Sequence, residues 1–80
     1  MGKNLLPLDR LLIGEKAIVK TLYAEGMERL RLLDLGLIQG ATVEALHQSP
    51  CGDPIAYSIM GAVIALRNED ASKVFVQNLS

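Results

Sequence analysis

The chain has 80 residues, of which half are hydrophobic, and its eight basic and nine acidic residues give a formal net charge of -1. A chain of this length has room for one hydrophobic core, so residues 1–80 should form a single domain. The high hydrophobic content excludes intrinsic disorder, which goes with low hydrophobicity and high net charge. The balanced charge argues against nucleic acid as a partner, because no excess of basic residues is available to neutralise phosphates.

Cysteine content and hydrophobic patterning bear on where the protein works. The single cysteine, Cys51, cannot form an internal disulfide, which favours a reducing compartment. The chain has no uninterrupted run of about 18 apolar residues, so we expect no direct insertion into a membrane. Its first residues are not followed by the apolar stretch of a secretion signal. We therefore expect a soluble, cytoplasmic module.

The first predicted element is a short helical turn over residues 8–12, opened by Pro7. Proline suits this position because the N–H group it lacks is not needed in the first turn of a helix. Residues 15–22 then predict the first strand, since several of them are β-branched. Alternation places Leu22 on the mixed, partly exposed face of this strand. A helix follows over residues 27–35, which are good helix formers without a β-branched residue.

Four further strands are predicted, over residues 42–48, 55–60, 62–66 and 74–76. Ile55, Tyr57 and Ile59 should face inward by alternation. Residues 62–66 form a short, wholly apolar run, as expected for a strand that is buried on both faces or lies centrally in a barrel. Gly61 predicts a tight hairpin before this run, and Asn68 predicts a capped helical turn after it.

These elements predict a mainly β fold. Five short, mostly antiparallel strands, with one short helix inserted after the first strand and short helical turns near both ends, favour a small five-stranded SH3-like barrel. Closing a barrel removes unpaired strand edges, which are a hazard in so apolar a chain.

The predicted helix has two apolar sides. One is formed by Met27, Leu30 and Leu33, and the other by Leu32 and Leu35. In one interpretation, one side packs on the barrel and the other on a loop or a chain terminus. In the second interpretation, Leu32 and Leu35 form an exposed edge that a partner covers.

Signatures of catalysis are absent, so we expect no enzyme. No glycine-rich loop precedes a helix in the pattern of a phosphate-binding site. The single histidine and the single cysteine have no orienting third group. The three aromatic residues, Tyr23, Tyr57 and Phe75, are scattered. They predict neither a groove for proline-rich peptides nor a stacking platform for single-stranded nucleic acid.

His47, Cys51 and Asp53 are the only candidate metal ligands that cluster in the sequence. Their side chains suit zinc or ferrous iron. A closed site needs four ligands, and these three lie in one turn. The alternative interpretation is a hairpin loop, because Pro, Gly and Asp residues form turns without any metal.

Three stretches carry motifs in a specific order and spacing. Residues 30–40 end in Leu-Gly-x-x-x-Gly, residues 49–55 hold Pro-x-Gly-Asp-Pro-Ile, and residues 64–71 hold Leu-Arg-x-x-x-Ala. Together they resemble the ferrous iron transport protein A (FeoA) family over nearly the whole chain. Gln39 departs from the family pattern, which often has Pro at this position.

The resemblance implies an SH3-like domain that acts as a small cytosolic accessory protein of ferrous iron uptake. The implied partner is the cytosolic part of FeoB, a membrane iron transporter, whose transport the domain would modulate. The same fold occurs as the C-terminal domain of iron-dependent repressors, so the alternative is a transition-metal-responsive module. Self-association is a third interpretation. No cofactor is expected to be required, and weak binding of Fe2+ or Zn2+ fits the alternative.

For docking, we predict that the helix supplies the contacts. Leu32 and Leu35 would be the apolar anchors, because binding energy concentrates in a few buried side chains. Arg29 and Arg31 would form a polar rim. The predicted partner-binding residues are Met27, Arg29, Arg31, Leu32 and Leu35.

Overall fold

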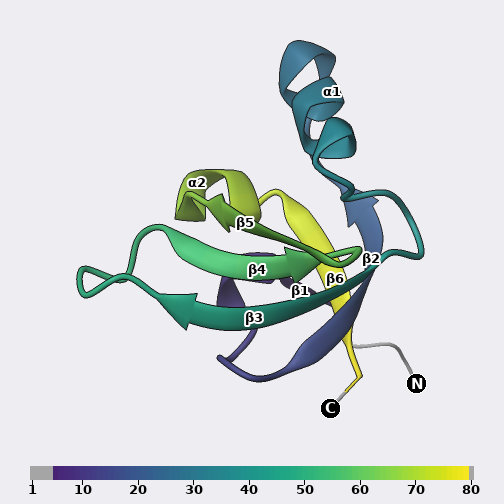
Figure 1. Ribbon diagram of the computed structural model, residues 1–80. Coiled ribbons are helices and arrows are strands. Elements are labelled where there is room, and N and C mark those ends of the chain that lie inside the picture. Colours follow the sequence, from purple (N-terminus) through teal and green to yellow (C-terminus); the bar gives the residue numbers. More distant parts are fainter. Residues whose placement is uncertain (1–4, 80) are drawn as a thin grey trace.

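A computed structural model describes residues 5–79 of the chain (Figure 1). Its elements, in chain order, are β1 (Leu5–Pro7), the 3-10 helix η1 (Leu8–Arg10), β2 (Lys16–Leu22), α1 (Gly26–Asp34), β3 (Thr42–Gln48), β4 (Ile55–Ile59), β5 (Ala62–Leu66), α2 (Asn68–Ala71) and β6 (Val74–Asn78). The prediction of a mainly β fold with few helices is confirmed.

The strands form one antiparallel sheet of six strands in the order β1-β6-β2-β3-β4-β5. The prediction of five strands closed into a barrel is wrong in both respects. The additional strand is β1, which pairs with β6 through Leu6 opposite Val76. Three residues that end in Pro7 are too short to show the alternation that identifies a strand. The sheet also does not close, because β1 and β5 stand at its two ends.

The core lies against one face of this curved sheet. Ile55, Tyr57 and Ile59 are buried, which confirms the predicted inward face of β4. Tyr57 is fully buried, and its hydroxyl donates a hydrogen bond of 3.3 Å to the carbonyl oxygen of Leu8. A buried tyrosine needs such a partner for its polar end. The 3-10 helix therefore both fills the core with Leu8 and satisfies the hydroxyl group.

A β-bulge changes the predicted faces of β2. The pairing register between β2 and β6 shifts between Val19 and Thr21. One extra residue in a strand reverses the side on which the following side chains lie. Leu22 is consequently buried, although simple alternation places it on the partly exposed face.

The burial predicted for β5 is also wrong. Val63 is exposed and only Leu66 is buried, because β5 is the last strand of the sheet and has β4 as its only strand neighbour. An apolar run alone does not distinguish a central strand from an apolar edge strand. The predicted hairpin at Gly61 is confirmed, with Met60 and Gly61 at φ angles of 52° and 88°.

Candidate interaction surface on the first helix

The helix α1 links β2 to β3 and projects from the sheet (Figure 1). Its end is fixed by two backbone hydrogen bonds. Gly36 N–H donates to the Leu33 carbonyl oxygen at 2.9 Å, and Leu37 N–H donates to the Leu32 carbonyl oxygen at 3.2 Å. This Schellman arrangement requires a left-handed residue, and Gly36 has a φ of 101°. Gly36 is therefore the residue that ends α1.

The same turn determines which side of α1 faces the core. It folds Leu37 back toward Leu32, and both side chains are fully buried. Leu33 and Leu35 are half-buried and pack against the core. The predicted exposed edge of Leu32 and Leu35 is therefore wrong: Leu32 is a core residue, and Leu35 lies at the margin of the core.

The exposed apolar side of α1 carries Met27 and Leu30 instead. Met27 is 80% exposed and Leu30 is 54% exposed. They line an open hollow of about 440 Å3 on the outer surface of the helix. We call this surface the α1 patch and define it by Met27, Glu28, Leu30, Arg31 and Asp34.

The predicted contact residues are thus only partly brought together. Met27 and Arg31 line the α1 patch, and Arg29 is exposed on the same helix without lining the hollow. Sequence reasoning left out Leu30, Glu28 and Asp34. The helical stripe that joins Met27 to Leu30 was the signal that pointed to Leu30.

Two ion pairs attach α1 to the rest of the molecule. Arg31 Nη2 lies 2.9 Å from Asp70 Oδ1 on α2, and the Asp70 side chain is only 10% exposed. Glu28 pairs with Lys73, which immediately precedes β6. The hydrogen bond that Lys73 Nζ donates to the Glu28 carboxylate raises the pKa of the Lys73 ammonium above its ordinary value. These contacts hold one face of α1 and leave Met27 and Leu30 toward solvent.

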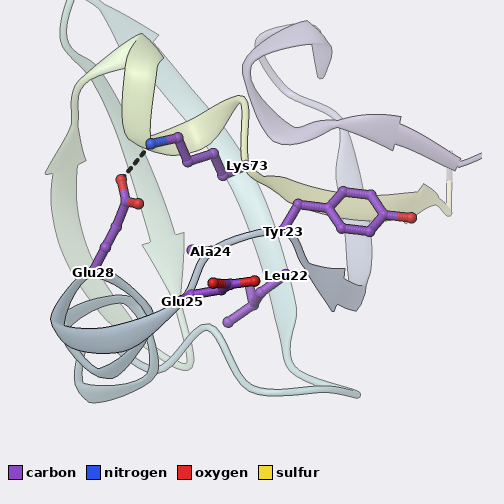
Figure 2. Close-up of a pocket in the computed structure, with 6 residues that line it drawn as sticks. All are labelled: Leu22, Tyr23, Ala24, Glu25, Glu28 and Lys73. Atoms are coloured by element: carbon purple, nitrogen blue, oxygen red, sulfur yellow. Dashed lines mark hydrogen bonds and ion pairs between the residues drawn. The ribbon is translucent and has the colours of Figure 1, made fainter.

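A second hollow lies between the start of α1 and the end of β2 (Figure 2). Figure 2 shows Glu28 and Lys73 joined across it, while the Tyr23 ring points away from this pair. That ring meets Phe75 edge-on, with a distance of 4.9 Å between ring centroids. Tyr23 is therefore held by an aromatic contact with β6 rather than aimed into the hollow.

The candidate metal ligands do not converge. His47 and Cys51 are exposed, at the end of β3 and in the following turn. Asp53 Oδ1 accepts a hydrogen bond of 2.9 Å from the backbone N–H of Asn68, the first residue of α2. Across residues 5–79, no three His, Cys, Asp or Glu side chains gather in a group that could hold a metal ion. The geometry favours the hairpin-loop interpretation of this segment.

Within the described part of the chain, no helix is both long enough and apolar enough to span a membrane. The FeoA domain family model matches residues 6–78. The chain belongs to the FeoA domain family. This confirms the resemblance found in the sequence, and the matched family is not a known enzyme family.

FeoA relatives extend this assignment. A fusion protein of Fe(2+) transport protein A and Fe(2+) transporter FeoB from Porphyromonas gingivalis is 34% identical over 73 residues. The match covers 91% of this chain and 9% of that protein, so the chain spans less than a tenth of its curated relative. The FeoA sequence in that relative is thus part of the same polypeptide as the transporter.

Solved FeoA structures share the fold. The FeoA protein of Chlorobium tepidum is 36% identical, with a TM-score of 0.86 over 94% of this chain and 71% of that one. The Stenotrophomonas maltophilia FeoA, an SH3-domain protein crystallised with zinc, is 27% identical, with a TM-score of 0.76 over 88% and 87%. The SH3-like character predicted from the sequence is thereby supported. A manganese-dependent transcriptional repressor, 16% identical over 99% of this chain and 44% of that one, has a TM-score of 0.86 and shares the fold alone.

Proposed function

We propose that this FeoA domain docks on the cytosolic part of a FeoB-type ferrous iron transporter and modulates its transport. The observation that carries the proposal is the P. gingivalis relative, in which FeoA and FeoB are one polypeptide. Fusion raises the effective concentration of one module at the other, which is useful only where the two act together. Where FeoA and FeoB are separate chains, the same association has to come from a docking surface. The domain would then be cytoplasmic and peripheral to the membrane through the transporter.

The α1 patch is the surface that best suits this docking. Met27 and Leu30 present an apolar centre, and Glu28, Arg31 and Asp34 surround it with charges of both signs. An apolar centre within a polar rim is the usual anatomy of a protein interface. Arg29 extends the rim along the same helix. Leu32 has no place among the anchors because it is already buried in the core.

The attachment of α1 also favours docking. The ion pairs of Arg31 with Asp70 and of Glu28 with Lys73 fix the helix before any partner arrives. A preorganised surface loses less conformational entropy on binding than a mobile one. The helix can therefore present Met27 and Leu30 in one fixed arrangement.

A binding measurement with purified cytosolic domains of the transporter tests the proposal. Met27→Asp and Leu30→Asp should each weaken binding by tenfold or more, about 1.4 kcal/mol, if the side chain is an anchor. Leu12→Asp is the matched control, because Leu12 is an exposed leucine outside the α1 patch. Wild-type affinity in both folded patch variants would remove the α1 patch as the docking site. Absence of binding by the unchanged domain would contradict docking itself.

A metal-responsive module is the second candidate function. It is favoured by the zinc in the S. maltophilia FeoA structure, although His47, Cys51 and Asp53 form no ligand group here. Titration of Zn2+ or anaerobic Fe2+ into the protein tests it through the NMR signals of His47 and Cys51. Unchanged signals at millimolar metal would exclude a site at these residues.

A further inference from the structure

We propose that the open edge of β5 pairs with β5 of a second copy of this chain, antiparallel and about a two-fold axis. This inference concerns a surface distinct from the α1 patch and does not depend on docking to a transporter. It starts from the position of β5, which ends the six-stranded sheet and pairs only with β4.

The hairpin register shows which backbone groups of β5 are open. Met60 and Gly61 form a two-residue turn between Ile59 and Ala62. In such a hairpin the residues next to the turn exchange hydrogen bonds, and bonded and non-bonded pairs then alternate along the strands. Ala62, Ile64 and Leu66 therefore direct their N–H and C=O groups toward β4.

Val63 and Ala65 direct the same groups away from the sheet. Among residues 5–79, the backbone hydrogen bonds of turns, loops and caps include none to Val63 or Ala65. Both residues are exposed. An edge with two free donors and two free acceptors is a template for one more strand.

The edge also lacks the features by which proteins block such pairing. Edge strands are commonly protected by proline, by charged side chains or by being very short. The opposite edge of the sheet, β1, has three residues and ends in Pro7. By contrast, β5 is a five-residue strand of Ala, Val, Ile, Ala and Leu, with neither charge nor proline. Of the two edges of the sheet, β1 is therefore protected against pairing with another strand and β5 is not.

The register of β5 favours a second copy as the occupant. Its middle residue is Ile64, so a two-fold axis at this residue places Val63 opposite Ala65 of the second copy, and Ala65 opposite Val63 of the second copy. These are the two residues whose groups point outward, so each pair exchanges two hydrogen bonds and all four open groups of each strand are satisfied. The two Ile64 residues form a non-bonded pair, in which side chains lie close together.

Charge does not oppose this pairing. The paired segments are uncharged, and in this register Arg67 faces Gly61 of the second copy. The two copies of Arg67 lie at opposite ends of the new strand pair, so no like charges meet. The result is a continuous sheet that runs through both molecules.

Sedimentation of the full chain from micromolar to millimolar concentration is the first test. We expect a concentration-dependent equilibrium between monomer and dimer. Amide hydrogen exchange then identifies the interface, because the Val63 and Ala65 amides should become protected as the dimer forms. A monomer at millimolar concentration, with both amides exchanging freely, would overturn the proposal. Protection that arises only with a transporter domain would also overturn it.

Two variants separate edge pairing from other routes to a dimer. Ala65→Pro removes the outward N–H at two symmetry-related positions, and proline is tolerated on an edge strand where the N–H faces solvent. It should raise the dissociation constant about tenfold or more. Val63→Lys should do the same by placing a lysine on the edge. Its control is Leu12→Lys, because Leu12 and Val63 are each 67% exposed.

Circular dichroism and thermal melts establish that each variant is folded before its association is compared. Dimerisation that persists unchanged in folded Ala65→Pro and Val63→Lys would overturn the β5 interface. Met27→Asp should leave the dimer intact, because the α1 patch takes no part in it. Loss of the dimer in Met27→Asp, with β5 variants unaffected, would assign self-association to α1 and overturn the inference.

Discussion

Arg31 and Asp70 are 39 residues apart along the chain and join α1 to α2 through a contact of 2.9 Å between Nη2 and Oδ1. The two ends of this ion pair lie in different surroundings. The Arg31 side chain is more than half exposed, whereas Asp70 is the one buried charged residue of the described chain. The contact therefore satisfies a buried carboxylate with a cation that remains partly in water.

This asymmetry predicts unequal effects of removing each partner. Arg31→Ala should lower the free energy of unfolding by about 1–2 kcal/mol, because it leaves the Asp70 carboxylate buried without its partner. Asp70→Asn should cost less, since its amide oxygen can still accept a hydrogen bond from Arg31. Urea unfolding of the two variants checks the order. A larger loss for Asp70→Asn would contradict this account of the contact.

The second prediction concerns Leu30 and Leu32, which lie on opposite sides of α1. Leu32→Ala should lower the free energy of unfolding by about 2–5 kcal/mol, because it leaves a cavity in the core. Leu30→Ala, at an exposed position of the same helix, should change it by no more than about 0.5 kcal/mol. Thermal or urea unfolding measures both. Equal losses would show that the two sides of α1 are wrongly assigned.

The same pair of leucines shows where sequence reasoning ended. Both sides of the helix are apolar, so periodicity identified two packing surfaces without choosing between them. Which side faces the core is decided by one contact with a distant helix and by the turn after α1, and the spacing of apolar residues predicts neither. Arg31 reaches Asp70 on α2, and the turn at Gly36 folds Leu37 back onto the Leu32 side. The sequence therefore identified the helix that carries the α1 patch, but it did not identify which side of that helix is exposed.

The strands show a similar division. The inward face of β4 was predictable because alternation holds through Ile55, Tyr57 and Ile59 without a bulge. The position of Leu22 was not, because a bulge in β2 arises from pairing with β6, far along the chain. The exposure of β5 follows from its place at the end of the sheet, and a run of apolar residues carries no information about strand order.

Tyr57 gives a prediction at alkaline pH. Burial, and secondarily the negative charge of Asp9, raises the pKa of the Tyr57 hydroxyl above its usual value of 10.0. The folded state therefore holds this proton more tightly than the unfolded state. Its contribution to stability is complete below pH 10.0 and is lost as the pH rises above that value toward the higher folded pKa. Urea unfolding at a series of alkaline pH values should show this decline.

The matched variant for that experiment is Tyr57→Phe. At neutral pH it removes the hydrogen bond to Leu8, at a cost of about 0.5–1.5 kcal/mol. The Leu8 carbonyl keeps a partner, because the N–H of Leu11 also donates to it at 3.0 Å. In alkali the variant should lose stability less steeply than the unchanged protein, since it has no buried hydroxyl to ionise. If the free energy of unfolding falls equally steeply with pH in both proteins, the loss of stability in alkali belongs to groups other than Tyr57.

The pair formed by Glu28 and Lys73 gives the last prediction. The Glu28 hydrogen bond is the largest cause of the raised pKa of Lys73, with smaller contributions from the charges of Glu28, Asp70 and Glu69. Glu28→Gln should therefore lower the pKa of the Lys73 ammonium toward its ordinary 10.5, as followed by NMR of the side chain. Because the folded pKa is the raised one, the stabilisation from this pair is complete below pH 10.5 and is lost as the pH rises through the folded value. Glu25→Gln is the control, since Glu25 lines the same hollow without pairing with Lys73. An unchanged Lys73 pKa in Glu28→Gln would show that the contact which tethers α1 to the start of β6 does not persist in solution.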